Sequence, residues 1–181
     1  AMATGSGKTL TALTLASKVA DKNKPMVLII VCPFINLCRQ WIREMAPFGL
    51  VPIPAFEGRD RWQSLLEEGY QRLSLRLEAV LAVVTTNATF MGEAFQSRLR
   101  PRVDSGTFHF LLVADEVHNL GAPGIKELLP AGITMRLGLS ATPERHHDPA
   151  GTKTVVDYFG GIVFEYSLDQ AIAEGRLCAY R

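Results

Sequence analysis

The 181-residue sequence is poor in cysteine, in net charge and in long apolar stretches, and each shortage excludes a class of protein. Cys32, Cys38 and Cys178 form neither a Cys-x-x-Cys pair nor a metal-ligand spacing, so we expect reduced thiols and no disulfide framework or zinc site. Reduced thiols predict a cytoplasmic protein, and no apolar run approaches the roughly 20 residues of a membrane span, so we expect no membrane partner. The formal net charge of +1 provides no strong global field for an acidic partner.

The rest of the composition is that of an ordinary globular domain. Hydrophobic residues make up 48% of the chain and charged residues 20%, and a chain of 181 residues can bury one sizeable core. The sequence contains no internal repeat, no low-complexity tract and no linker. We therefore expect one domain over residues 1–181.

Apolar runs rich in β-branched residues alternate along the chain with segments that have helical spacing. The runs span 26–32, 79–84, 108–114 and 133–139, with shorter strands expected at 51–56 and 162–166. Helices are expected from residue 10 to a stop at 23–25, and at 35–46, 61–77, 89–99, 155–159 and 168–174. Continuous apolar runs are typical of strands buried on both faces. The alternation predicts an α/β fold, a three-layer α/β/α sandwich whose mainly parallel sheet has helices on both faces.

Residues 2–9, Met-Ala-Thr-Gly-Ser-Gly-Lys-Thr, are typical of a phosphate-binding loop that leads into a helix N-terminus. The residues expected to hold nucleotide phosphates are Thr4, Gly5, Ser6, Gly7, Lys8, Thr9 and Leu10. Lys8 adds a mobile positive charge, and the Thr9 hydroxyl can reach a phosphate-bound Mg²⁺. The pattern departs from the general one at Met2, where glycine is usual. The alternative is a flexible Gly/Ser linker that happens to precede a helix.

Two acids, Asp115 and Glu116, follow directly on the apolar run at 108–114. Ligands of open parallel sheets bind outside the carboxyl ends of the strands, and unpaired carboxylates buried there would be costly. A bound Mg²⁺ would supply the missing partner. Asp115 would then hold the ion together with Thr9, while Glu116 would orient and deprotonate an attacking water. The competing interpretation is a solvated loop with two acids.

Four segments in order along the chain together resemble one family. They are the loop at 2–9, the Asp-Glu-Val-His box at 115–118, the Ser-Ala-Thr stretch at 140–142 and the exit segment at 159–180. The chain thus resembles the first RecA-like motor domain of superfamily 2 DExH-type helicases and translocases, and is similar to bacterial type III restriction-like DNA helicases. The resemblance implies a P-loop NTPase that uses ATP and Mg²⁺. It also implies that His118 links the hydrolysis centre to the hydroxyls of Ser140 and Thr142.

The resemblance further implies a surface that contacts nucleic acid through sugar and phosphate, which positions a strand without reading its sequence. The residues implied are Pro33, Arg39, Gln40 and Thr86. For the neighbouring Leu37 and Trp41, burial in the core is the favoured interpretation.

Two further clusters are interpreted as loops. Arg98, Arg100 and Arg102 lie around a proline with no aromatic residue between them, which favours a solvated loop over a binding patch. The stretch at 146–148, His-His-Asp, lacks other ligands at zinc spacing, which favours a loop over a metal site.

The resemblance implies hydrolysis of ATP coupled to movement on nucleic acid. In this family ATP lies between two RecA-like domains, and arginines of the second domain complete the site. A phosphate loop normally follows a strand, and none precedes residue 2. We therefore expect an excerpt that lacks the first strand and the second motor domain, and that hydrolyses ATP weakly by itself.

The exit segment and the Met-Ala-Thr-Gly opening favour DNA over RNA as the partner. An RNA helicase of the same superfamily is the nearest alternative. A nucleotide-gated nucleic-acid-binding module with little catalysis is another, although Lys8, Asp115 and Glu116 argue against it. A P-loop kinase or GTPase would leave the Ser-Ala-Thr stretch unexplained, and the guanine-reading motif Asn-Lys-x-Asp is absent from the sequence.

Overall fold

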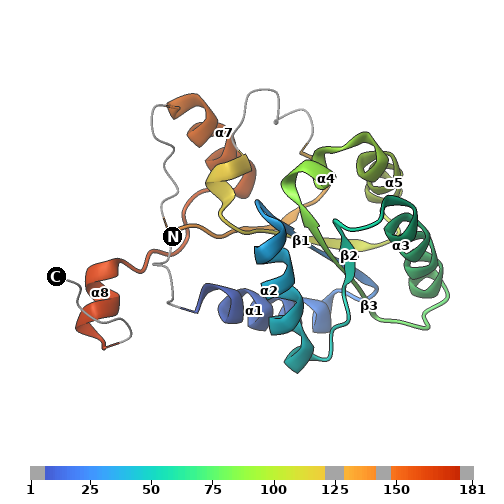
Figure 1. Ribbon diagram of the computed structural model, residues 1–181, viewed down its shortest axis with the longest axis horizontal. Coiled ribbons are helices and arrows are strands. Elements are labelled where there is room, and N and C mark those ends of the chain that lie inside the picture. Colours follow the sequence, from blue (N-terminus) through green and yellow to red (C-terminus); the bar gives the residue numbers. More distant parts are fainter. Residues whose placement is uncertain (1–6, 121–128, 142–147, 176–181) are drawn as a thin grey trace.

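The computed structural model describes residues 7–120, 129–141 and 148–175. Its centre is a five-stranded sheet with the strand order β2-β3-β1-β4-β5, in which every pairing is parallel (Figure 1). The strands are β1 (Met26–Cys32), β2 (Ile53–Ala55), β3 (Val80–Thr86), β4 (His109–Ala114) and β5 (Met135–Gly138). The predicted parallel sheet is therefore confirmed.

The central strand β1 explains why the sheet is covered on both faces. All seven of its residues are buried. Side chains alternate across a strand, so Val27, Ile29 and Val31 belong to one core while Met26, Leu28, Ile30 and Cys32 belong to the other. A continuous apolar run is thus what two packed faces require.

Helices complete the two outer layers, which confirms the predicted three-layer arrangement. The helices α1 (Lys8–Lys22) and α2 (Ile35–Met45) pack on the face that holds Met26 and Leu28. On the other face lie α3 (Arg59–Ser74), α4 (Asn87–Met91) and α5 (Glu93–Asp104), and Val155 of α7 (Pro149–Phe159) joins the same core. Two short 3₁₀ turns are η1 (Ala46–Phe48) and η2 (Val117–Leu120).

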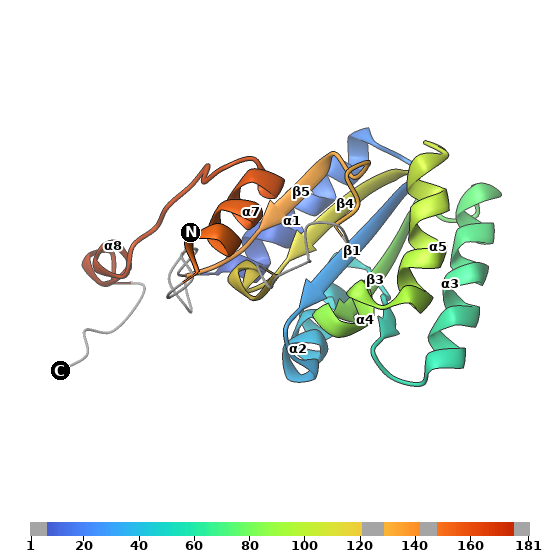
Figure 2. The same cartoon turned by 90° about the horizontal axis from the view of Figure 1, so that it is seen from above.

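The end of the described chain departs from these layers. The helix α8 (Leu168–Ala173) lies apart from the sheet in both views (Figure 1, Figure 2). The strand predicted at 162–166 is wrong: only Tyr166 forms a bridge, and Val163 is 87% exposed. The segment is apolar, but it is not one of the five strands of the sheet.

The helix predicted at 89–99 is two helices, because the chain breaks at Gly92. This residue has an extended backbone, with ψ 144°, between α4 and α5. The α4 helix begins earlier than predicted because the Thr86 hydroxyl caps it, accepting a hydrogen bond from the Thr89 N–H at 3.2 Å. Sequence spacing carries the helical period across the break and so conceals it.

The arginine cluster is not the solvated loop that was predicted. Arg98 and Arg102 lie on α5 and both contact Glu67 of α3, and the Arg102 guanidinium lies 4.1 Å from the ring centroid of Tyr70. These contacts hold α5 against α3. The sequence pattern around the arginines does not reveal them, because their partners belong to a different helix.

Cys32 and Cys38 are free and buried, as predicted. The neighbouring Cys38 side chain and burial raise the pKa of the Cys32 thiol, so this thiol stays protonated. Cys178 lies outside the described residues. Within the described ranges, no helix has both the length and the apolar character to cross a bilayer.

Candidate functional site

The carboxyl ends of four parallel strands form one rim of the sheet, and the predicted site residues gather there. The strand register pairs Cys32 with Thr86 and Val31 with Ala114. Pro33 directly follows β1, and Asp115 directly follows β4. Ser140 comes two positions after the end of β5. Because β1 is flanked by strands that come later in the chain on both sides, this rim is also the topological switch point, where open α/β sheets bind their ligands.

The helix α1 brings Lys8 to this rim. Gly7 adopts a left-handed backbone, with φ 87°, and its carbonyl accepts the first helical hydrogen bond, from the Thr11 N–H at 3.0 Å. The Lys8 Nζ lies 3.5 Å from the Glu116 Oε1. The two side chains are 11% and 27% exposed, so the ion pair is largely shielded from water. The fold therefore brings together the lysine and one of the two acids that the motifs singled out.

Asp115 is held from two sides. The residue is 8% exposed. Its Oδ1 accepts a hydrogen bond from the Glu116 N–H at 3.0 Å, and its Oδ2 accepts one from the Trp41 Nε1–H at 2.9 Å. These two donors fix the plane of the carboxylate. Trp41 is buried in the core, as favoured by the sequence, but its polar contact was missed because no local pattern connects positions 41 and 115.

The backbone at Glu116 is strained. Its φ of 44° lies in the left-handed region, which residues other than glycine rarely adopt. The Glu116 carbonyl accepts hydrogen bonds from the Asn119 N–H at 2.9 Å and the Asn119 Nδ2 at 3.1 Å. Val117 N–H donates to the Leu139 carbonyl at 2.9 Å. Strain that the surroundings maintain in this way is typical of functional positions.

His118 contacts Ser140, as the resemblance implied. The His118 Nδ1 and the Ser140 Oγ are 2.9 Å apart. The Asn119 amide nitrogen donates to the Glu116 carbonyl, which fixes the orientation of that amide, and the same nitrogen lies 3.1 Å from the His118 Nε2. Because this nitrogen can only donate, Nε2 accepts, and the imidazole proton lies on Nδ1, which donates to Ser140.

His118 also lies near the acid that precedes it by two positions. Its Nδ1 is 3.5 Å from the Glu116 Oε2. Lys8, Glu116, His118 and Ser140 therefore form a continuous chain of contacts from α1 to the end of β5.

The other predicted nucleotide contacts are placed only in part. Thr9 lies half-buried in the first turn of α1, and Leu10 is 61% exposed. Thr4, Gly5 and Ser6 lie outside the described residues, as do Met2, Thr142 and the two histidines at 146 and 147. Asp148 caps α7, its Oδ1 accepting a hydrogen bond from the Gly151 N–H at 2.8 Å.

Asp115 and Thr9 suit Mg²⁺ by the chemistry of their oxygens. Mg²⁺ that binds with a nucleotide takes one or two protein ligands and completes its shell with phosphate oxygens and water. The described residues contain no group of three or more His, Cys, Asp or Glu placed to share a metal ion. Within the same residues, Asp115 forms no ion pair, and one donor on each oxygen leaves further acceptor capacity.

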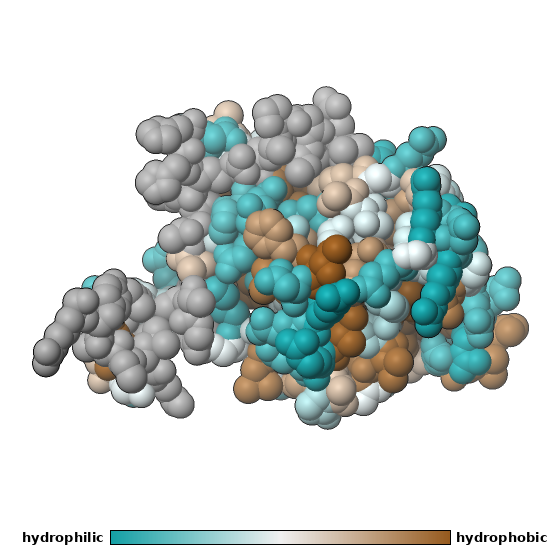
Figure 3. All heavy atoms as spheres, in the orientation of Figure 1, coloured by the Kyte–Doolittle hydropathy of each residue, from teal (hydrophilic) through white to brown (hydrophobic). Residues whose placement is uncertain are grey.

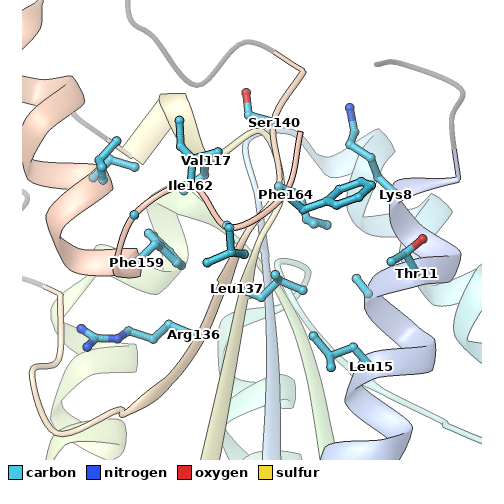
Figure 4. Close-up of a pocket in the computed structure, with 17 residues that line it drawn as sticks. Lys8, Thr11, Leu15, Val117, Arg136, Leu137, Ser140, Phe159, Ile162 and Phe164 are labelled. Carbon is cyan, nitrogen blue, oxygen red and sulfur yellow. The ribbon is translucent and has the colours of Figure 1, made fainter. Parts of the chain in front are cut away.

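A pocket of about 310 Å³ begins at this rim and runs along the open edge of β5. Figure 4 shows Lys8 and Ser140 at one end of it and Leu15 and Arg136 at the other. Phe159 of α7 and the exposed residues Ile162 and Phe164 line its remaining sides. The lining is mostly apolar, so the pocket itself is no phosphate site.

The four predicted nucleic-acid contacts lie at two strand ends and on α2, and some of their polar groups already have partners within the domain. Pro33 and Thr86 lie at neighbouring strand ends, and the Thr86 hydroxyl is used to cap α4. Arg39 and Gln40 are exposed on α2, where hydrophilic side chains lie beside apolar ones in Figure 3. Arg39 pairs with Glu57 at 2.6 Å, and Gln40 donates to Glu44 at 2.7 Å.

Comparison with known proteins shows the family of the chain. Residues 1–145 match the family described as the res subunit of type III restriction enzymes. A curated relative is the endonuclease subunit of the type I restriction enzyme EcoAI from Escherichia coli. The two sequences are 29% identical over an alignment of 185 residues that includes 99% of this chain. The chain spans about a fifth of that relative, or 20% of its length.

One solved structure shares the fold. It is a nuclease-deletion mutant of the Type ISP restriction-modification enzyme LlaGI in complex with a DNA substrate mimic. The match has a TM-score of 0.68 and 18% identity, and it covers 97% of this chain and 18% of the other. The likeness supports the RecA-like form of the α/β fold.

Proposed function

Because the chain belongs to the family of type III restriction enzyme res subunits, we propose that residues 1–181 are the first RecA-like motor domain of a DNA helicase or translocase. The observation that carries the proposal is the shielded ion pair between Lys8 and Glu116. It joins the two groups that phosphoryl transfer to water requires, a cation for the phosphates and a base for the water.

Each residue of the rim has a role in this reaction. Lys8 offsets the negative charge of the transferring phosphoryl group, and its contact with Glu116 compensates both charges while ATP is absent. Glu116 orients the attacking water and accepts its proton. Asp115 and Thr9 hold Mg²⁺, which neutralises charge on the phosphate oxygens when it is bound with ATP.

The contact between His118 and Ser140 would communicate the state of ATP to the rest of the domain. His118 lies within 3.5 Å of Glu116 and 2.9 Å of Ser140. If Glu116 moves on ATP binding, the His118 imidazole transmits the movement to Ser140, which follows β5. Thr142 would extend the same link.

DNA is the proposed partner, together with a second RecA-like domain of the same full-length protein. The matched relatives are named as restriction enzymes, and the solved relative was determined with a DNA substrate mimic. The chain spans only 20% of the curated relative, which leaves ample length for further domains in proteins of this kind. Arginines of the second domain would complete the site, so residues 1–181 alone would bind ATP and hydrolyse it weakly.

Glu116→Gln in the full-length protein tests this function, with Glu78→Gln as a matched control at an exposed ion pair. We expect Glu116→Gln to keep ATP affinity while DNA-stimulated turnover falls by roughly 10²–10⁴-fold, the usual contribution of a general base. Glu78→Gln should leave both unchanged. Turnover that survives in Glu116→Gln would refute the role, and stimulation by RNA but not DNA would refute the partner.

A further inference from the structure

One buried hydrogen bond at the rim has no place in the motifs that predicted the site. The indole Nε1–H of Trp41 donates to the Asp115 Oδ2 at 2.9 Å, and Trp41 is only 1% exposed. Its rings pack in the same core as Cys38 and Met45, the other buried residues of α2. The indole is thus held by the core while its single polar atom meets a carboxylate at the strand mouth.

From this contact we infer that Trp41 is a positioning residue for Asp115, which sets the carboxylate for Mg²⁺ bound with the nucleotide. The inference rests on the proposed function, because it requires Asp115 to hold that ion. Asp115 could otherwise rotate about its side-chain torsions, and the Glu116 N–H alone fixes only Oδ1. The Trp41 donor fixes Oδ2 and so defines the direction in which the remaining lone pairs point.

The position of Trp41 on α2 gives the contact a second consequence. Arg39 and Gln40 precede it directly and are exposed, Arg39 on the opposite side of the helix and Gln40 on its flank. Trp41 therefore connects the helix that carries the proposed DNA contacts to the carboxylate of the proposed magnesium site. A displacement of α2 moves the donor of Asp115 with it.

The chain offers a matched control in its second tryptophan. Trp62 lies on α3, is 4% exposed and belongs to the core on the other face of the sheet, where its ring centroid is 5.8 Å from that of Phe95. Trp41→Phe and Trp62→Phe remove the same atoms from similarly buried positions. Only Trp41→Phe removes a donor to Asp115.

The experiment measures the Mg²⁺ concentration that half-saturates binding of a fluorescent ATP analogue, in the full-length protein. We expect Trp41→Phe to raise this concentration by roughly 10–100-fold, the usual effect of losing the partner of a metal-binding residue. Analogue binding in EDTA should equal that of Trp62→Phe, whereas the thermal midpoint should fall further in Trp41→Phe, because the buried Asp115 Oδ2 loses its donor.

Three results separate the possibilities. Equal Mg²⁺ dependence in Trp41→Phe and Trp62→Phe would overturn the inference. Adding Trp41→Phe to Asp115→Asn should cause no further change, and an additional loss would overturn it as well. If Asp115→Asn itself leaves the Mg²⁺ dependence unchanged, the proposed function fails. Should Trp41→Phe not fold, 3-benzothienylalanine at position 41 keeps the shape of the indole, lacks only the N–H, and is expected to give the same rise.

Discussion

Replacing Arg102 by alanine tests whether the arginine cluster of α5 supports the fold or binds nucleic acid. Arg102 pairs with Glu67, lies 4.1 Å from the ring centroid of Tyr70 and donates to the Arg98 carbonyl at 2.8 Å. Its side chain is 26% exposed, and that of Glu67 is 41% exposed. The contacts thus join α3 and α5 at a half-buried seam.

The magnitude follows from these contacts. A cation–π contact at a partly exposed site contributes about 0.5–1 kcal/mol. The ion pair, screened by solvent at these exposures, contributes about 0.2–1 kcal/mol. We therefore expect Arg102→Ala to lower the free energy of unfolding by about 1–2 kcal/mol, which is a fall of about 2–8 °C in the melting temperature of a domain of this size.

Thermal and urea unfolding measure this change, and Arg72→Ala is the control. Arg72 forms an ion pair with Glu78 at 2.7 Å on the exposed end of α3, where we expect no resolved change in stability. DNA affinity should be the same in both variants as in the parent protein. An Arg102→Ala variant of unchanged stability and weakened DNA binding would refute the reasoning and restore the binding-patch interpretation.

Three further predictions follow from single contacts. Ser140→Ala removes the partner that accepts the His118 Nδ1–H, so DNA stimulation of ATP turnover should fall by about 3- to 10-fold while ATP affinity is unchanged; equal turnover with and without the hydroxyl would contradict this. Glu57→Gln releases Arg39 and should tighten DNA binding. Arg39→Gln should weaken DNA binding and reduce the slope of log affinity against log salt concentration by about 0.9 in salt titrations. An unchanged slope would exclude Arg39 from the interface. Gly69→Ala places a Cβ 2.5 Å from the Leu81 Cδ1 and should destabilise by about 1–3 kcal/mol in urea unfolding. This cost should disappear when Gly69→Ala is introduced into a Leu81→Ala background, and a stabilised Gly69→Ala in the parent protein would contradict the packing.

The sheet could be predicted closely because burial on both faces leaves a direct mark on the sequence. All seven residues of β1 are buried, and the predicted run and the observed strand coincide at 26–32. The buried face of α2 is equally predictable, because its buried residues Cys38, Trp41 and Met45 are three and four positions apart. Strongly periodic elements of this kind need no information from the rest of the chain.

Elements without such a mark were mispredicted. The segment at 162–166 has the apolar character of a strand, but apolar character does not report whether a segment pairs with a neighbouring strand, and residues 162–165 form no strand. The break at Gly92 leaves the helical period intact on both sides. The role of Arg98 and Arg102 depends on Glu67, which belongs to a different helix.

The site shows the same division. Lys8, Asp115 and Glu116 carry motifs, because phosphate and metal chemistry demand particular residue types at fixed spacing. The motifs do not reveal the role of Trp41, because its contribution is one hydrogen bond to a residue that only the fold brings near. The left-handed backbone of Glu116 was likewise hidden, since glutamate has no preference for it.

The most direct test of the account is a crystal structure of the full-length protein with Mg²⁺ and a non-hydrolysable ATP analogue. The account predicts that the terminal phosphate lies between Lys8 and Glu116, that their 3.5 Å contact opens, and that Asp115 and Thr9 face the metal. An analogue bound elsewhere, with the contact between Lys8 and Glu116 still closed, would contradict it.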